Sequence, residues 1–174
     1  GQAFGQGGRP QQADQVHEIT VSLHEAYHGS SRSLSLQGPE GKKTIDVRIP
    51  AGSTTGTKIR LRGEGLILKI NVADDPRFDV VGRNLQTTVD VPVWLAALGG
   101  RVDVPTMDGE VSMTIPAGTS GGAKLRLKGK GLPAHGKQPD GDLIAVVRLV
   151  MPKSLSDGQR AAYEKLRDAD KGQS

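Results

Sequence analysis

Apolar and polar side chains alternate in short runs along most of this chain. The run SLSLQ at 33–37 switches strictly between small polar residues and leucines, and β-branched residues fill many of the other runs. Alternation with a period of two is typical of strands that bury one face. Pro-Ala-Gly turns at 50–52 and 116–118 interrupt the pattern. The strands predicted in this way lie near residues 16–23, 31–37, 43–49, 57–62, 66–73, 85–93, 101–105, 110–115, 123–128 and 142–150.

The chain contains an internal repeat. Residues 45–65 read IDVRIPAGSTTGTKIRLRGEG and residues 111–131 read VSMTIPAGTSGGAKLRLKGKG, in register at an offset of 66. An earlier pair, ITVSLHEAYHG at 19–29 and VDVPVWLAALG at 89–99, matches at an offset of 70. Each member of that pair reads as a strand followed by one short helical turn that a glycine ends. The two halves are therefore expected to share one fold.

The two halves diverge after their matching Gly-x-Gly. In the second half LPAHGKQPDGD at 132–142 precedes the next strand, whereas in the first half Gly65 leads directly into LILKINV. Leu66 then aligns with Leu143, so the offset rises to 77 and the first half lacks 11 residues. A tight Gly-Glu-Gly hairpin could join its strands without them. The expectation that we favour is a loop left out of the numbering, because the same Gly-x-Gly enters a loop in the second half.

The predicted fold class is mainly β, with two tandem small β-sandwich domains, short helical turns and a C-terminal helix. Each half offers about five short strands and one helical turn, which is enough for a small sandwich. We place the first sandwich at 15–76 and the second at 77–152. A Gly-rich linker remnant at 1–14 precedes them, and a dimerisation helix and tail at 153–174 follow.

A helix is predicted at the C-terminal end of the chain. Ser156 and Gln159 have the spacing of a capping box, which marks a helix start. Ala162, Leu166 and Ala169 form one narrow apolar stripe. A helix this short is marginal alone, so its stripe must pack on its own chain or on a second chain. The spacing does not choose between these two partners.

Composition narrows the class of protein. The 174 residues include no Cys, which excludes disulfides, zinc ribbons, thiolate nucleophiles and iron–sulfur clusters. Aromatic residues make up 3% of the chain, which argues against proteins that stack nucleic-acid bases on several rings. No run approaches the ~18 apolar residues of a membrane-spanning helix. The chain starts at Gly1 and its first Met is Met107, so we expect a fragment.

The net charge of +4 is unevenly placed along the chain. Residues 15–73 carry eight basic and five acidic side chains, a net +3, whereas residues 74–152 carry nine of each. A generally basic nucleic-acid binder would cluster its charge on one face. The excess in one half therefore favours an acidic partner for that half.

Two stretches match chemical motifs, but their contexts argue against both. HEAYH at 24–28 matches the zinc-binding H-E-x-x-H, yet Gly29 ends its helix after one turn, and the repeat aligns it with WLAAL at 94–98. GLPAHGK at 131–137 matches a phosphate-binding loop, yet it lacks the following Ser/Thr and joins two strands. We therefore predict no enzyme, no bound metal and no cofactor.

A binding surface remains as the functional candidate. Leu34 and Leu36 share one face of a predicted strand that lies early in a small sandwich. They could simply fill the core, as expected for Val102 and Val104 in the second half. Alternatively, an edge strand with apolar pockets can accept an extended peptide as an added strand.

Six segments of the chain are distinctive: ITVSLHEAYHG, IDVRIPAGSTTGTKIRLRGEG, DDPRFDVVGRNL, VPVWLAALGGRVDVPTMDG, TIPAGTSGGAKLRLKGKGLP and GDLIAVVRLVMP. Together they resemble the C-terminal substrate-binding region of DnaJ-type J-domain co-chaperones. The chain has no His-Pro-Asp, the signature of the J domain, and no Cys for the zinc finger of that family. It is therefore similar to the subclass without the zinc finger, and within it to curved-DNA-binding co-chaperones. GQAFGQGG at the N-terminus resembles the end of the Gly/Phe-rich linker of the family.

This resemblance implies a protein that binds unfolded polypeptides in a hydrophobic groove and delivers them to a DnaK-type ATPase. It implies a cytoplasmic homodimer with no membrane partner, and the alternative is a sequence-tolerant DNA-binding protein. The implied groove residues are Ile19, Leu34, Leu36 and Phe78, with His17 at the rim. The acidic tail of the ATPase would bind Arg32 and Lys42, and the dimer would form through Ala162, Tyr163, Leu166 and Ala169.

Overall fold

The described part of the chain is β-rich and divides into two compact units. The computed structural model describes residues 15–38 and 41–172, so the predicted linker at 1–14 lies outside the described residues. The predicted fold class, mainly β with two domains and a C-terminal helix, is confirmed. The boundaries expected at residues 76 and 152 stay predictions. The described residues of the first unit fall within 15–87, 105–109 and 126–145, and those of the second within 88–104, 110–125 and 146–172.

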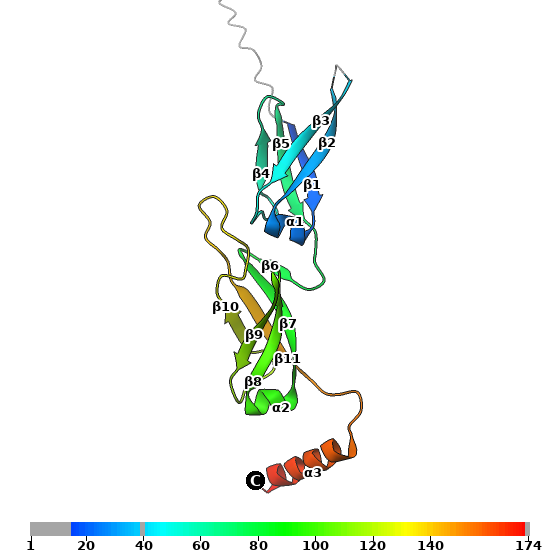
Figure 1. Ribbon diagram of the computed structural model, residues 1–174, viewed down its shortest axis with the longest axis vertical. Helices are drawn as coiled ribbons and strands as arrows, with labels where there is room; N and C mark the ends of the chain where they lie inside the picture. The colour runs from blue at the N-terminus through cyan, green and yellow to red at the C-terminus, as the bar shows by residue number, and fades with distance from the viewer. Residues whose placement is uncertain (1–14, 39–40, 173–174) are drawn as a thin grey trace, which may run out of the picture. The chain divides into compact units, whose positions relative to one another are not determined.

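Every predicted strand has an observed counterpart, and one further strand, β6, was missed. β6 spans three exposed residues, too few to show alternation. No helix in the described ranges is long and apolar enough to span a bilayer. The strands in Figure 1 are β1 (Gln15–Val21), β2 (Ser30–Gly38), β3 (Gly41–Ile49), β4 (Lys58–Leu61), β5 (Leu66–Val72), β6 (Asp79–Val81), β7 (Asn84–Pro92), β8 (Gly100–Thr106), β9 (Gly109–Ile115), β10 (Lys124–Leu127) and β11 (Leu143–Val150). The helices are α1 (Leu23–His28), α2 (Val93–Leu98) and α3 (Asp157–Lys171).

The strands of the described residues form four small sheets. β1, β5 and β4 pair in that order, with β1 parallel and β4 antiparallel to β5. β2 and β3 form a separate antiparallel pair, which lies opposite the first sheet in Figure 1. The remaining strands pair in the orders β10-β11-β7-β6 and β8-β9. The first two sheets belong to the first compact unit and enclose its core.

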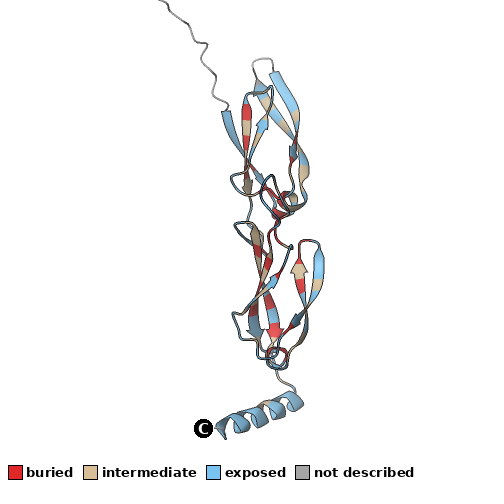
Figure 2. Ribbon diagram, turned by 90° about the vertical axis from the view of Figure 1, so that its left-hand side faces the viewer, coloured by how far each residue is buried: buried red, intermediate tan, exposed pale blue. Residues whose placement is uncertain are grey.

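Alternate residues of these two sheets fill the core of the first unit. Each Val, Leu or Ile side chain that becomes fully buried stabilises the fold by about 1.5–3 kcal/mol, which favours strands that keep one face apolar. The buried positions appear in red along the strands in Figure 2. The cluster consists of Ile19 and Val21 of β1, Ala26 of α1, Val47 and Ile49 of β3, and Leu66, Leu68 and Ile70 of β5.

A short hairpin joins β4 to β5. Leu61 pairs with Leu66, so the strands stay in register up to the turn at 62–65. Gly63 and Gly65 have φ values of 85° and 61°, a left-handed conformation that glycine adopts at little cost. In the structure the Gly-Glu-Gly turn therefore closes the hairpin between the two strands. The expectation of a loop left out of the numbering after Gly65 stays a prediction.

The two halves of the internal repeat make matching backbone hydrogen bonds. The N–H groups at 52–53 donate to the carbonyl oxygen of Ala26, at 2.8 and 3.2 Å. In the second half the N–H groups at 118–119 donate to the carbonyl oxygen of Ala96, at 2.9 and 3.0 Å. Both halves therefore attach a short helix to a Pro-Ala-Gly turn in the same way. The correspondence continues in the bonds Gly56 N–H to Ile70 O and Gly122 N–H to Val147 O.

The first unit also holds α1 against the turn at 105–109. The hydroxyl of Tyr27 donates to Asp108 Oδ2 at 2.8 Å. Burial, together with the Asp108 carboxylate, raises the pKa of Tyr27 to about 12 from an ordinary value of 10.0. The neutral hydroxyl is thus the form that stabilises the fold.

We expect this contribution of Tyr27 to disappear in alkali. Because the folded-state pKa is raised, the stabilisation is complete below pH 10.0 and is lost as the pH rises towards 12. Urea unfolding of the parent and of Tyr27→Phe across this range measures the effect. The difference in unfolding free energy between the two should shrink as the pH rises, and a constant difference would show that the hydrogen bond does not govern it.

Candidate functional site

One backbone edge of β2 has no strand beside it in the described chain. β2 and β3 make up their whole sheet, so each has a strand neighbour on one side only. Leu34 and Leu36 are half-buried and pack against the core cluster of the first unit. Their cross-strand partners are Ile45 and Lys43. An unpaired edge beside half-buried leucines can offer both main-chain hydrogen bonds and apolar contacts.

The structure brings together three of the predicted groove residues in one cluster, and a fourth lies outside that cluster. Ile19 is 8% exposed within the cluster that Leu34 and Leu36 pack against. His17 lies two residues before Ile19 on β1 and is exposed. Phe78 does not belong to this cluster. It is 2% exposed and lines a cavity of about 240 Å³ with Leu23 and Val72, of which Val72 also packs against the cluster.

Arg32, predicted to bind an acidic tail, is already held within its own unit. Its Nη2 lies 2.7 Å from Glu25 Oε2, and its Nη1 donates to the carbonyl oxygen of Thr20 at 3.1 Å. Glu25 also accepts from the N–H of Ser22, which completes the capping box of α1. The Ser22 N–H, and then Arg32, hold the pKa of Glu25 below its usual value. The guanidinium therefore links α1 to β1 and β2.

The second predicted cation, Lys42, lies on the other face of the hairpin. Arg32 is opposite the buried Val47 and so shares the face that packs on the core. Lys42 is opposite Gln37, one position out of phase, and is exposed. Because side chains alternate across a strand, these two cations point to opposite faces. An acidic peptide that met both would have to wrap around an edge.

The H-E-x-x-H stretch has the structure of a capped turn. α1 spans six residues, and the rings of His24 and His28 lie 4.4 Å apart between centroids. Glu25 uses its carboxylate for the cap and for Arg32. No cluster of three or more His, Asp or Glu side chains that could hold a metal ion is found in the described ranges.

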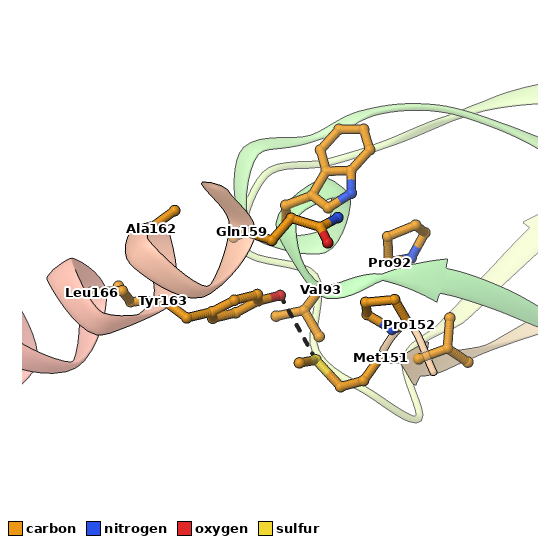
Figure 3. A pocket seen from close by; sticks show the side chains of 11 residues that line it. Pro92, Val93, Met151, Pro152, Gln159, Ala162, Tyr163 and Leu166 are labelled. Carbon is orange, nitrogen blue, oxygen red and sulfur yellow. Dashed lines mark hydrogen bonds between the residues drawn. The ribbon is translucent and has the colours of Figure 1, made fainter. Parts of the chain in front are cut away.

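The second unit contains an apolar cavity between α2 and α3. Its volume is about 560 Å³. α3 begins with the predicted capping box, in which Ser156 and Gln159 satisfy each other's backbone N–H groups. No residue of this helix is buried, and Figure 2 shows most of it exposed. The side chains that line the cavity (Figure 3) are Pro92, Val93, Trp94, Ala97, Val150, Met151, Pro152, Gln159, Ala162, Tyr163 and Leu166.

Three of the four predicted dimer residues line this cavity. Ala162, Tyr163 and Leu166 do so, whereas Ala169 does not. The hydroxyl of Tyr163 donates to Met151 Sδ at 3.7 Å, the dashed line in Figure 3. Leu166 remains 59% exposed. The helix thus touches its own unit at its first turns and leaves apolar surface uncovered.

Sequence reasoning missed the contribution of α2 to this surface. Trp94 is 60% exposed and Leu98 is 76% exposed, although both are large apolar side chains. The repeat contained a usable signal, because it aligns Trp94 with His24 and Leu98 with His28. His24 and His28 are exposed as well. The second half thus carries large apolar side chains at two positions that are exposed in both halves. Exposed apolar side chains of this kind mark a surface that a partner can cover.

Comparison with known proteins identifies the class to which this fold and these surfaces belong. The family model for the DnaJ C terminal domain matches residues 15–152, which include both repeated halves. The chain therefore belongs to the DnaJ C-terminal domain family. The predicted resemblance is confirmed.

Two kinds of relative match most of the chain. The chaperone protein DnaJ of Deinococcus proteolyticus is 41% identical over 167 residues, covering 93% of this chain and 52% of that protein. The curved DNA-binding protein of Escherichia fergusonii is 40% identical over 173 residues, covering 87% of this chain and 56% of that protein. The curved DNA-binding protein of Coxiella burnetii is 38% identical over 186 residues, at 95% and 57% coverage. The chain spans about half the length of these relatives.

Proposed function

We propose that this chain is the client-binding part of a DnaJ-type co-chaperone. It binds apolar segments of unfolded polypeptides along β2 and acts in the cytoplasm with a DnaK-type ATPase, to which the clients pass. The observation that carries this proposal is the pair of half-buried leucines, Leu34 and Leu36, beside the unpaired edge of β2. An added strand would gain backbone hydrogen bonds along this edge and would cover the remaining leucine surface.

The proposed partner of α3 is a second copy of the chain. Leu166 and Trp94 expose apolar surface on either side of the cavity, and a second copy would cover this surface. Two peptide grooves in one dimer would strengthen the binding of a client with several apolar segments, because the second contact becomes intramolecular. Docking of an acidic ATPase tail at Arg32 and Lys42 remains a prediction, since the two lie on opposite faces of the hairpin.

DNA binding is the second candidate function. Exposed basic side chains alternate along β4 and recur on β10, at Lys58 and Arg60 and at Lys124 and Arg126. In the second half Arg126 lies 3.5 Å from Asp142, which offsets part of this charge. Phosphate contacts made by such side chains would weaken steeply as salt concentration rises.

Fluorescence anisotropy of a labelled, unstructured, leucine-rich peptide without net charge tests the first proposal. We expect saturable binding that resists added salt and duplex DNA. The double variant Leu34→Asp, Leu36→Asp should bind the peptide at least ~10-fold more weakly, because an apolar ligand would desolvate two carboxylates at these half-buried positions. Binding that DNA or moderate salt abolishes would favour the second candidate instead.

A matched control separates loss of the groove from a general effect of charge. Ser35→Asp with Gln37→Asp adds the same two charges to the outward face of β2 and should leave peptide affinity unchanged. Circular dichroism and thermal melting establish that each variant is folded. If the leucine double variant does not fold, Leu36→Gln alone replaces it, since Leu36 pairs with exposed Lys43 close to the end of the hairpin where Gly38 pairs with Gly41. Unchanged affinity in that folded variant would show that Leu36 serves only the core.

A further inference from the structure

The side chain of Arg83 joins two turns that are far apart in sequence. It projects from the turn between β6 and β7, and its Nη1 donates to the carbonyl oxygen of Gly52 at 2.7 Å. Its Nη2 donates to the carbonyl oxygen of Pro133. One planar guanidinium therefore binds the Pro-Ala-Gly turn at 50–53 and the loop at 131–141 together. All three segments belong to the first compact unit.

The turn and the loop that this guanidinium joins pack closely against each other. A Cβ at Gly52 would overlap the carbonyl oxygen of Pro133, so the turn and the loop approach as closely as glycine permits. The carbonyl oxygen of Arg83 accepts from the N–H of Leu132 at 3.1 Å, and the side chain of Leu132 is fully buried. Arg83 thus holds the loop through its own backbone and through its side chain.

Arg83 binds carbonyl groups rather than a carboxylate. In the described part of the chain no Asp or Glu forms an ion pair with it, and its buried Nε has no hydrogen-bond partner. The planar guanidinium holds its N–H donors in a rigid fork that can reach the two fixed carbonyl oxygens at once. A lysine ammonium cannot reproduce that geometry. The arrangement therefore depends on arginine and not only on positive charge.

The turn at 50–53 is also hydrogen-bonded to α1. Its N–H groups at 52–53 bind Ala26 of α1, and α1 is bound in turn to Arg32 of β2 through Glu25. We propose that Arg83 is a positioning residue that clasps the loop at 131–141 to the turn at 50–53, so that the two segments resist local opening together. The clasp does not depend on the proposed function, because it involves contacts within the fold alone.

The repeat supplies an internal control for this proposal. The turn at 116–119 makes the same two bonds to Ala96 that the turn at 50–53 makes to Ala26. A Cβ at Gly118, the counterpart of Gly52, would meet nothing within 4 Å. The two turns therefore make matching hydrogen bonds to their short helices. They differ because Arg83 binds the turn at 50–53.

Amide hydrogen exchange tests the clasp, with Gly52, Ser53 and Leu132 as probes and Gly118 and Thr119 as references. Arg83→Ala should raise exchange at the three probe amides at least ~10-fold and leave the two references unchanged, because it promotes local opening. Arg83→Lys should protect the probes only in part. Arg101→Ala, which removes an exposed arginine on β8, should change none of them.

Three results would overturn the proposal. Unchanged exchange at Gly52 and Ser53 in Arg83→Ala would show that the guanidinium does not hold the turn. Equal acceleration at all five amides would show a global loss of stability in place of local opening. Full protection in Arg83→Lys would show that charge alone suffices. A variant that does not fold is replaced by Arg83→Gln, which keeps one donor group and should give an intermediate acceleration confined to the probes.

Discussion

Replacing Gly141 by alanine is expected to destabilise the protein strongly. A Cβ at this position would overlap both the carbonyl oxygen and the carbonyl carbon of Arg83, and the backbone nitrogen of Asn84 would lie 3.2 Å from it. Backbone atoms cannot rotate away as a side chain can. Neighbouring bonds also resist a shift, since the side-chain oxygen of Asn84 accepts from the N–H of Asp142 at 2.8 Å. Forced overpacking of this kind costs about 3 kcal/mol or more.

Thermal melting of Gly141→Ala measures this cost. For a chain of this size about 3 kcal/mol corresponds to a fall in Tm of roughly 6–12 °C. Gly121→Ala is the matched control, because a Cβ there would meet only the flexible side chain of Leu149, at 3.5 Å. The control should lie within ~0.5 kcal/mol of the parent. A Gly141→Ala variant as stable as the control would mean that the β6–β7 turn yields at little cost.

The second large effect is expected in the oligomeric state. Leu166→Asp should convert the proposed dimer to a monomer, halving the mass in sedimentation equilibrium. Leu166 lines the α2–α3 cavity and is 59% exposed, so a second copy would bury it and a carboxylate there would lose its hydration. The helix itself should persist, since its capping box at Ser156 is untouched.

Lys165→Asp provides the control for this experiment. Lys165 is exposed on α3 and does not line the cavity, so its replacement changes charge without altering the apolar surface. It should leave the mass at that of the parent. A parent chain that sediments as a monomer, or a Leu166→Asp variant that keeps the dimer mass, would refute the role proposed for α3.

Strand positions were predictable because burial of one face imposes a period of two. Ile19 and Val21 on β1, and Leu68 and Ile70 on β5, fill one core from alternate positions. The capping box at Ser156 was equally readable, because it needs only residues of one turn. Local pattern and local hydrogen bonding are both contained in short stretches of sequence.

Contacts between distant segments were not predictable in this way. Arg32 reads as an available cation, yet the fold of α1 brings Glu25 to 2.7 Å from it. Phe78 reads as a groove residue, yet it is 2% exposed and lines a cavity that Leu34 does not line. The hydrogen bond from Arg83 to Gly52 joins residues that are 31 positions apart, and no spacing or motif in the sequence signals it. Such contacts depend on tertiary approach, which spacing along the chain does not encode.

The two short helices show what duplication makes available to a protein. α1 and α2 present the same carbonyl, that of Ala26 or Ala96, to the same kind of turn. Their outward positions differ completely, with His24 in one and Trp94 in the other. The backbone bonds do not involve these side chains, so mutation can alter them without loss of the fold. One copy can thus acquire a new recognition surface while its sister copy keeps the old one, and a library randomised on α2 alone would explore that freedom directly.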